Sequence, residues 1–347
     1  MAKQIVNGIT FFYPDSPCFV FNPAPIRLAG NVDRLQLTIS GNGVTHTVTY
    51  NVRNNTAVDI SEFLQGLFFG LAMGADIDYS EMISYTEMTL ASTISAVALD
   101  AAGNTLAICS MNITLIWGAL AVGEDITAQR KVTYFRGYPF TIGFYARHAG
   151  NIIFEDGLDT NDFGMVQRGL LYMGIDGIES DKASVLLSFE EDGDMAMLPI
   201  VTIDAVDACD EDTIYLRWVN RHGMWDYWLF KVGDPTRTVA GGGTWNRNNV
   251  GRWVEKYHWQ GDAGRRQNLT RNDVIPVCAP LVDSDTFDML QDVTTSPCVD
   301  MYLGTEDGEP KWTAVTIEAG QYTKDNKKPE QDFVMNIVLP EIPIQSL

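Results

Sequence analysis

Apolar and polar residues alternate along much of the chain, which is the pattern of β-strands with one buried face. Leu35, Leu37 and Ile39, for example, share one face of a predicted strand. The strands predicted from this pattern are 35–39 paired with 44–52, 93–99 paired with 105–117, 131–135 joined to 140–145 through 136–139, 184–189 paired with 197–203, and single strands at 312–317 and 333–339. Turn-forming residues separate them, so the pattern predicts a mainly β chain.

Two short segments have the period of an amphipathic helix instead. The first follows Asp59, a predicted N-cap with Glu62 in the capping-box position, and extends for about three turns at most. Its apolar stripe is Ile60, Phe63, Leu64, Leu67 and Phe68. The second helix is predicted at residues 284–292, with Ser284 as its N-cap.

The most aromatic segment of the chain is Ile214–Phe230, which predicts a β-hairpin. It holds three tryptophans, two tyrosines and a phenylalanine around the turn Asn220–Gly223. Both faces of both strands carry apolar side chains. We therefore expect the hairpin to be covered on both sides, by its own sandwich and by a further domain or subunit.

Many strands with only two short helices indicate two or more β-sandwich-like modules. A length of 347 residues suits two or three domains. We expect an N-terminal β-sandwich module at residues 1–122 and a C-terminal β-rich region at residues 123–347. The C-terminal region would contain the aromatic hairpin 214–230 and a long Gly/Asn-rich loop at residues 233–272.

The net charge of the chain limits the classes of partner that it can bind. It has 45 acidic and 24 basic residues, a formal net charge of −21, so we expect no nucleic-acid partner. The candidate exception is a group of arginines at Arg265, Arg266 and Arg271, with Arg247 and Arg252 nearby. Because these lie in the predicted loop, we interpret them as solvated charges, with a basic binding site as the alternative.

Cysteine usage and hydropathy suggest where the chain is made. The five cysteines lack metal-ligand spacing and form an odd, scattered set, which predicts free thiols in a reducing compartment: Cys18, Cys109, Cys209, Cys278 and Cys298. The N-terminus lacks the pattern of a secretory signal, and no run reaches the roughly 18 apolar residues that a membrane span needs. We expect synthesis in a cytoplasm and no membrane insertion.

Recognisable catalytic motifs are missing from the sequence. The four histidines form no HExxH pair, and there is no nucleophile elbow, P-loop or dinucleotide fingerprint. We predict that the chain is not an enzyme and has no cofactor, although paired carboxylates of a glycan hydrolase remain an alternative. The weak calcium candidates are Asp156, Asp159 and Asp162, for which a solvated acidic turn is the favoured interpretation.

The candidate binding or interface region is the aromatic cluster between Trp218 and Trp259. Its residues, with the neighbouring tyrosines, are Tyr215, Trp218, Trp225, Tyr227, Trp228, Trp245, Trp253 and Trp259. Exposed rings at this density would form a carbohydrate-stacking platform or a protein interface. The apolar alternation within the hairpin instead favours core packing for most of them.

Several segments resemble virion proteins of tailed phages that infect Bacteroidetes. They are Pro17–Ile26, Gly30–Leu37, Asp59–Leu64, Ile116–Leu120, Arg136–Phe140, Ile214–Gly223 and Tyr227–Phe230. The resemblance implies a structural virion component of the tail or adsorption apparatus, built of β-sandwich modules, with copies of itself and other virion proteins as partners. It would be made in the host cytoplasm and localise to the virion. The alternative function is a carbohydrate-binding, receptor-recognition module that uses the Trp218–Trp259 cluster on a host surface glycan.

Overall fold

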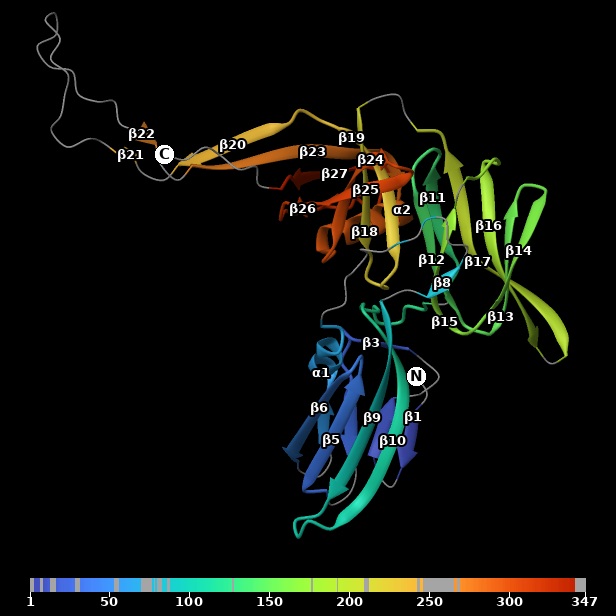
Figure 1. Ribbon diagram of the computed structural model, residues 1–347, viewed down its shortest axis with the longest axis vertical. Coiled ribbons are helices and arrows are strands. Elements are labelled where there is room, and N and C mark those ends of the chain that lie inside the picture. Colours follow the sequence, from blue (N-terminus) through green and yellow to red (C-terminus); the bar gives the residue numbers. More distant parts are fainter. Residues whose placement is uncertain are drawn as a thin grey trace, which may run out of the picture. The chain divides into compact units, whose positions relative to one another are not determined.

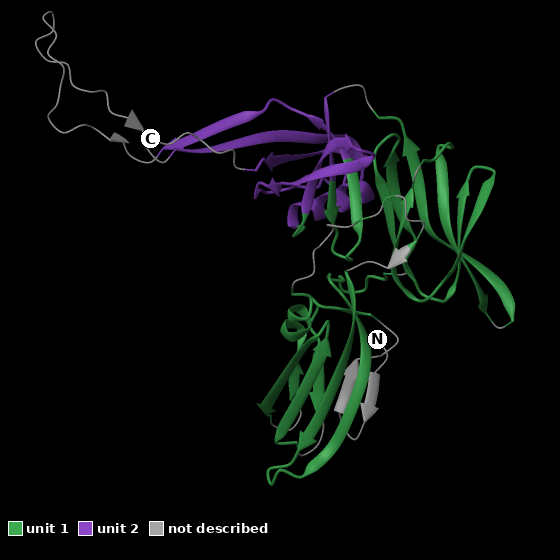
Figure 2. Cartoon of the chain, viewed as in Figure 1, with its two compact units in different colours: residues 1–208, 217–228, 296–298 green, residues 209–216, 229–295, 299–347 purple. Residues whose placement is uncertain are grey.

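A computed structural model describes the chain between residues 3 and 340, with gaps at 7–8, 13–16, 29–31, 53–55, 70–76, 78, 80–82, 86–87, 127, 176, 192, 209–211, 242–243, 246–264 and 267–268. The described residues form twenty-seven strands and two short α-helices, which confirms the mainly β prediction (Figure 1). The chain divides into two compact units (Figure 2). Unit 1 is residues 1–208, 217–228 and 296–298, and unit 2 is residues 209–216, 229–295 and 299–347. The break expected after residue 122 therefore lies inside unit 1.

The N-terminal part of unit 1 consists of two sheets. One has the order β1 (Lys3–Val6), β2 (Ile9–Phe12), β4 (Pro25–Leu28) and β7 (Ala57–Asp59). The other has the order β3 (Cys18–Phe19), β10 (Thr105–Ile116), β9 (Thr89–Leu99), β5 (Arg34–Gly41) and β6 (Val44–Asn51). Both hairpins predicted here are confirmed. The turn of the first is Asn42-Gly43, where both residues have positive φ, as a tight two-residue hairpin requires.

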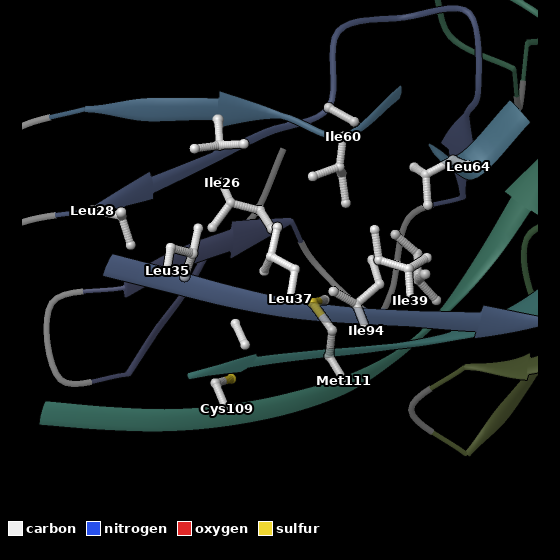
Figure 3. Packing of buried hydrophobic residues seen from close by; sticks show 14 of the residues in the cluster. Ile26, Leu28, Leu35, Leu37, Ile39, Ile60, Leu64, Ile94, Cys109 and Met111 are labelled. Atoms are coloured by element: carbon white, nitrogen blue, oxygen red, sulfur yellow. The ribbon is translucent and has the colours of Figure 1, made fainter. Parts of the chain in front are cut away.

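The alternating residues of these strands build the core of this part (Figure 3). Leu35, Leu37 and Ile39 of β5 are fully buried, and they pack with Ile26 of β4 and Met111 of β10. The period-two pattern therefore placed this core correctly, because each strand has one face toward it.

The first helix, α1, spans Ser61–Gly66 and is shorter than predicted. Its N-cap is Ile60, without a side-chain capping bond, so the prediction of Asp59 as the N-cap was wrong. The Asp59 carboxylate accepts hydrogen bonds from Ser61 N and from Ala24 N, beside the neighbouring strand. Burial opposes ionisation, but these backbone donors hold the pKa of Asp59 below its usual range. Asp59 therefore joins the helix start to the sheet.

The middle part of unit 1 has two further sheets. The larger has the order β11 (Arg130–Phe135), β17 (Asp194–Val206), β16 (Lys182–Glu191), β13 (Gly150–Asp156) and β14 (Asp159–Val166). The smaller has the order β12 (Phe140–Ala146), β15 (Gly169–Ile175) and β8 (Ser84–Tyr85). The predicted pairing of 184–189 with 197–203 is confirmed.

The expected hairpin of residues 131–135 with 140–145 is not formed. Strand β11 pairs in parallel with β17, whereas β12 pairs with β15 in the other sheet. The connection includes Gly137, whose positive φ of 86° fits a sharp corner between sheets. Tyr134 and Phe140 still meet, with ring centroids 5.3 Å apart. Alternation identified both strands correctly but could not say which strands they pair with.

Unit 2 is organised around one sheet. Its order is β25 (Glu309–Ala314), β24 (Val299–Glu306), β18 (Thr213–Val219), β19 (Trp225–Val232), β23 (Leu269–Asp283), β27 (Glu330–Val338) and β26 (Thr316–Ile317), with β20 (Thr236–Gly241) paired to β23. Only residues 213–216 of β18 and 229–232 of β19 belong to this unit. Helix α2 (Ser284–Asp292) packs Phe287 against Phe333 of β27.

Two predictions about unit 2 need correction. The N-cap of α2 is Asp283, whose carboxylate accepts from Thr286 N, and not Ser284. Residues 233–272 are not a loop throughout, because β20, the start of β23 and the short pair β21 (Thr244–Trp245) and β22 (Arg265–Arg266) lie within them. Glycine and asparagine suggested a loop, but cross-strand pairing made the described part an extended hairpin.

Candidate functional site

The rings of the aromatic hairpin lie inside the protein. Tyr215, Trp218, Trp225 and Tyr227 are all buried, and Trp218 has no exposed surface. Trp228 is half-buried, with its ring 5.2 Å from that of Phe135. The core-packing interpretation is therefore confirmed for these rings. The four buried ones offer no surface to a sugar or a partner protein.

The remaining candidates were Trp245, Trp253 and Trp259. Trp245 lies on β21, but its side chain is outside the described part of the structure, as are Trp253 and Trp259 altogether. Their role in binding stays a prediction. The aromatic cluster thus splits into a buried group before residue 230 and a group after residue 240.

Residues 217–228, here called the tip, form the end of the aromatic hairpin and belong to unit 1. Asn220 organises its turn: Asn220 Oδ1 accepts from the backbone N–H groups of His222 and Met224. Gly223 has φ of 73°, and a Cβ at that position would lie 2.9 Å from Trp117 O. Glycine was expected there for its positive φ, and the close approach of the Trp117 carbonyl is a second reason.

A buried ion pair holds the tip on strand β11. Arg130 Nη2 is paired with Asp226 Oδ1, and Asp226 is 4% exposed. The other oxygen, Asp226 Oδ2, accepts from Asn220 Nδ2 at 2.9 Å, and Arg130 Nη1 donates to Gly143 O. Each ion therefore has several partners, as buried charges need. Sequence reasoning missed this pair, although an aspartate between Trp225 and Tyr227 in a buried strand was a usable signal.

The tip also packs directly on β12. Thr141 Oγ1 and Tyr227 OH form a buried hydrogen bond of 2.7 Å, and the rings of Phe140 and Tyr227 lie 5.2 Å apart. A Cβ built on Gly143 would be 2.7 Å from Met224 Cβ. Every residue of β12 is buried, and these contacts place Phe140, Thr141 and Gly143 of this strand against the tip.

The turn of the tip is fastened to residues 118–124. Glu124 Oε1 lies 2.8 Å from both Arg221 Nη2 and His222 Nε2, and Ala119 N donates to Arg221 O at 2.6 Å. Burial, the largest influence, and the charges of Arg130 and Arg221 hold the pKa of His222 below its usual value, although the Glu124 carboxylate acts in the opposite direction. Burial acts against ionisation of Glu124, but the Ala121 N–H and the charges of His222 and Arg221 hold its pKa below the usual range.

A second segment that contains arginine is exposed where the tip is buried. Here "the arm" means β20 with residues 269–273 of β23. All six residues of β20 are exposed, including Val239 at 51%. Strand β27 pairs with β23 only from Val274 onward, and Leu339 N donates to Asp273 O, so residues 269–272 have β20 as their one strand partner within the described sheet. The arm therefore presents strand edges as well as side chains.

The arm's described arginines share a single carboxylate. Arg237 Nε lies 2.9 Å from Asp273 Oδ1, and Arg271 Nη2 pairs with Asp273 Oδ2. Hydrogen bonds from Arg271 and then Arg237 hold the pKa of Asp273 well below its usual range. Two guanidinium groups against one carboxylate leave a positive surplus. Arg237 was missed in the sequence because it lies outside the arginine group that was singled out.

The calcium candidates do not form a site. Asp156 accepts from Glu179 N and from both Ser180 N and Ser180 Oγ. Burial opposes ionisation of Asp156, but these donors hold its pKa below the usual range. Asp162 accepts from Gly164 N and Asn151 Nδ2, and Asp159 lies at the start of β14. No group of three possible metal ligands occurs among the described residues. Asp156 therefore binds residues 179–180, and Asp162 binds Gly164 and Asn151.

Comparison with known proteins gives little further information. No family model and no curated protein matches the chain. A solved structure of a 1.5-MDa bacterial ice-binding adhesin is similar over 86% of this chain and 92% of that chain, with 9% identity and a TM-score of 0.17. A TM-score that low carries no argument about fold or function. None of the described helices is long and apolar enough to cross a membrane.

Proposed function

We propose that this chain is a structural component of a tailed-phage virion, part of the tail or adsorption apparatus, that works through contacts with copies of itself and other virion proteins. The resemblance of its segments to virion proteins of phages infecting Bacteroidetes suggests this class. On this proposal it is made in the host cytoplasm and ends in the particle.

The observation that supports the proposal most is the exposed arm. A two-stranded ribbon whose six β20 residues are all exposed gains little stability from its own chain. Its edges, which are unpaired among the described residues of β20, and its exposed Val239 are suited to a partner that completes the sheet or covers the side chain. The buried tip, in contrast, supports a role in holding unit 1 together.

Mass spectrometry of purified phage particles tests the proposal. Particles banded in a density gradient and washed at high salt should contain the chain at a constant ratio to the major capsid protein. A nonstructural phage protein from the same lysate is the control, and its ratio should fall with each wash. If the chain falls in the same way, it is not a virion component.

A further inference from the structure

Strand β6 (Val44–Asn51) forms one edge of its sheet and pairs with β5 alone among the described strands (Figure 1). The two-residue turn before it makes Gly41 and Val44 a hydrogen-bonded pair, and such pairs alternate along the ladder. The alternate residues of β6 therefore point their backbone N–H and C=O groups away from β5. These residues, whose side chains are also exposed, are Thr45, Thr47, Thr49 and Asn51.

The devices that normally protect a sheet edge are missing from β6. The strand contains no lysine, arginine, aspartate, glutamate or proline, and its register with β5 continues without a bulge. Natural proteins use charges, prolines and bulges to stop an edge from pairing with a foreign strand. The other strands of four or more residues that end a described sheet either carry a charged residue, as β1, β11, β14, β20 and β25 do, or are buried throughout, as β12 is.

The two sides of this sheet differ in how well they cover the core. On the other side β3 pairs only with Leu115 and Ile116, so most of β10 has β9 as its one strand partner among the described residues. The inward residues of β10 are nevertheless buried: Ala107, Cys109, Met111 and Ile113. The inward residues of β6 pack on the same core but are only half-buried: Val44, Val48 and Tyr50. The core is therefore closed at β10 and incompletely covered at β6.

A second copy of β6 can complete this edge. In an antiparallel pair, residues with outward backbone groups lie opposite each other and exchange both hydrogen bonds. A pair centred on Val48 meets this condition, because Thr47 then lies opposite Thr49 of the second copy, and Thr45 opposite Asn51. This register gives about eight backbone hydrogen bonds. Cross-strand contacts between threonines, and between the two copies of Val48, add to them.

Charge also favours a second copy at this sheet. The chain has a formal net charge of −21, so two copies repel each other wherever acidic surfaces meet. Strands β5, β6, β9 and β10 together contain one lysine, arginine, aspartate or glutamate, which is Arg34. Two copies of this acidic chain can therefore meet along β6 without opposing like charges on these strands.

We propose that β6 of one copy pairs in antiparallel fashion with β6 of a second copy, so that one sheet continues across the dimer. This inference rests on the proposed function in that copies of the chain are taken to meet during assembly. The contact is isologous and closes at two copies, since each β6 uses its single free edge. The arm remains available to a different partner.

Sedimentation velocity of the full-length chain over a concentration series tests the dimer. The wild-type chain should dimerise. Thr47→Pro should abolish dimerisation, because it removes an outward N–H from each copy and none of the bonds to β5. Thr47→Asp and Thr49→Lys should each weaken it about fivefold or more, because each places two like charges diagonally across the twofold axis.

Gln36→Asp is the matched control. Gln36 is exposed on β5 and lies opposite Thr49 of its own chain, so the change adds the same charge to the same face one strand further in. Dimerisation of this variant should stay within about twofold of wild type, because the edge of β6 is unaltered. Equal weakening by Gln36→Asp and Thr47→Asp would overturn the inference in favour of contact through the face of the sheet.

A mixing experiment tests the register. An equimolar mixture of Thr47→Asp and Thr49→Lys copies should dimerise more strongly than either variant alone, because the aspartate lies directly opposite the lysine. Salt should reduce this gain by screening the pair. A mixture no stronger than its components would overturn the pairing centred on Val48.

Two further outcomes would overturn the inference. Dimerisation of Thr47→Pro at wild-type strength would place self-association elsewhere, for example on the arm. A wild-type chain that is monomeric at all concentrations would leave β6 to a strand of another protein. Circular dichroism should show the wild-type fold in every variant, and if Thr47→Pro does not fold, the two charged variants and their mixture decide the question.

The two proposals fail separately. Presence of the chain in washed particles without dimerisation through β6 would overturn this inference and leave the proposed function standing. Dimerisation through β6 with absence from particles would do the reverse.

Discussion

The tip and the arm are two β-hairpin segments a few residues apart in sequence, with opposite surroundings. Each contains arginine, but only the tip contains tryptophan. In the tip, Arg217 is buried, its guanidinium 4.8 Å from the Trp225 ring centroid, and donates to Tyr79 OH. In the arm, Arg237 and Arg271 share Asp273 on a surface whose β20 residues are all exposed.

The comparison of Arg217 with Arg237 shows that residue type by itself did not decide the burial of arginine. The tip is buried because β12 offers it complementary groups: a glycine that admits Met224, a hydroxyl for Tyr227 and, beside them, Arg130 for Asp226. Within the described structure the two strands of the arm pair with each other, and Leu339 N donates to Asp273 O at the base of the arm. The tip is therefore expected to contribute to folding stability, whereas the arm is expected to act on contacts between molecules.

The largest effect should come from the buried ion pair. Asp226→Ala leaves Arg130 without its carboxylate in a buried position, and should lower the free energy of unfolding of unit 1 by about 3–5 kcal/mol. Urea denaturation followed by tryptophan fluorescence measures this. Asp194→Ala, at an exposed strand end, is the control and should change stability by about 0.5 kcal/mol or less. A loss below about 1 kcal/mol for Asp226→Ala would mean that the pair does not hold the tip.

A smaller loss should follow from overpacking between β12 and the tip. Gly143→Ala places a Cβ where Met224 Cβ would be 2.7 Å away, and should cost about 1–3 kcal/mol in the free energy of unfolding. Gly177→Ala is the matched control, because nothing lies within 4 Å of its Cβ position and its φ is not in the left-handed region. Equal stability of the two variants would contradict the close contact.

Acidification should loosen the turn of the tip. The pKa of His222 is lower in the folded protein than its unfolded value near 6.5, so the unfolded chain binds the proton first. The stability from neutral His222 is complete above pH 6.5 and is lost as pH falls through the folded pKa. Because the pKa of Glu124 is also lowered in the folded protein, protonation of Glu124 removes further stability as the pH falls below the range in which His222 titrates. Hydrogen exchange at residues 219–224 between pH 7.5 and 5 measures the opening, and His222→Gln should flatten its upper part.

The smallest change in stability should come from a valine-to-serine substitution in the arm, although the same substitution in the aromatic hairpin should be severe. Val239→Ser should change the free energy of unfolding by about 0.5 kcal/mol or less, because Val239 is exposed. Val219→Ser, at a buried position of β18, should cost about 2–4 kcal/mol through lost apolar burial and a buried hydroxyl. Thermal unfolding of the pair measures the contrast directly. Similar melting temperatures would remove the distinction between the two hairpins.

Strands were predictable wherever one face is buried, as in β5 with Leu35, Leu37 and Ile39, because alternation is a local property of the chain. Pairing was less predictable: residues 131–135 and 140–145 were recognised as strands, yet they joined different sheets. The two N-cap predictions were wrong for a related reason. Asp59 and Ser284 have suitable residue types, but Asp59 is used by Ala24 N of another segment and Asp283 supplies the cap of α2.

The sequence by itself determined the β class, most strand positions, both helices and the aromatic hairpin with its glycine turn, since these depend on periodicity and local backbone preference. Only the tertiary structure decided that Arg130 would meet Asp226 and that β12 would be covered on both faces. It also placed Arg237, Arg265, Arg266 and Arg271 on strands and not in a loop. These outcomes depend on which distant segments come together, and the pairing energies between such segments leave no periodic signal in either one alone.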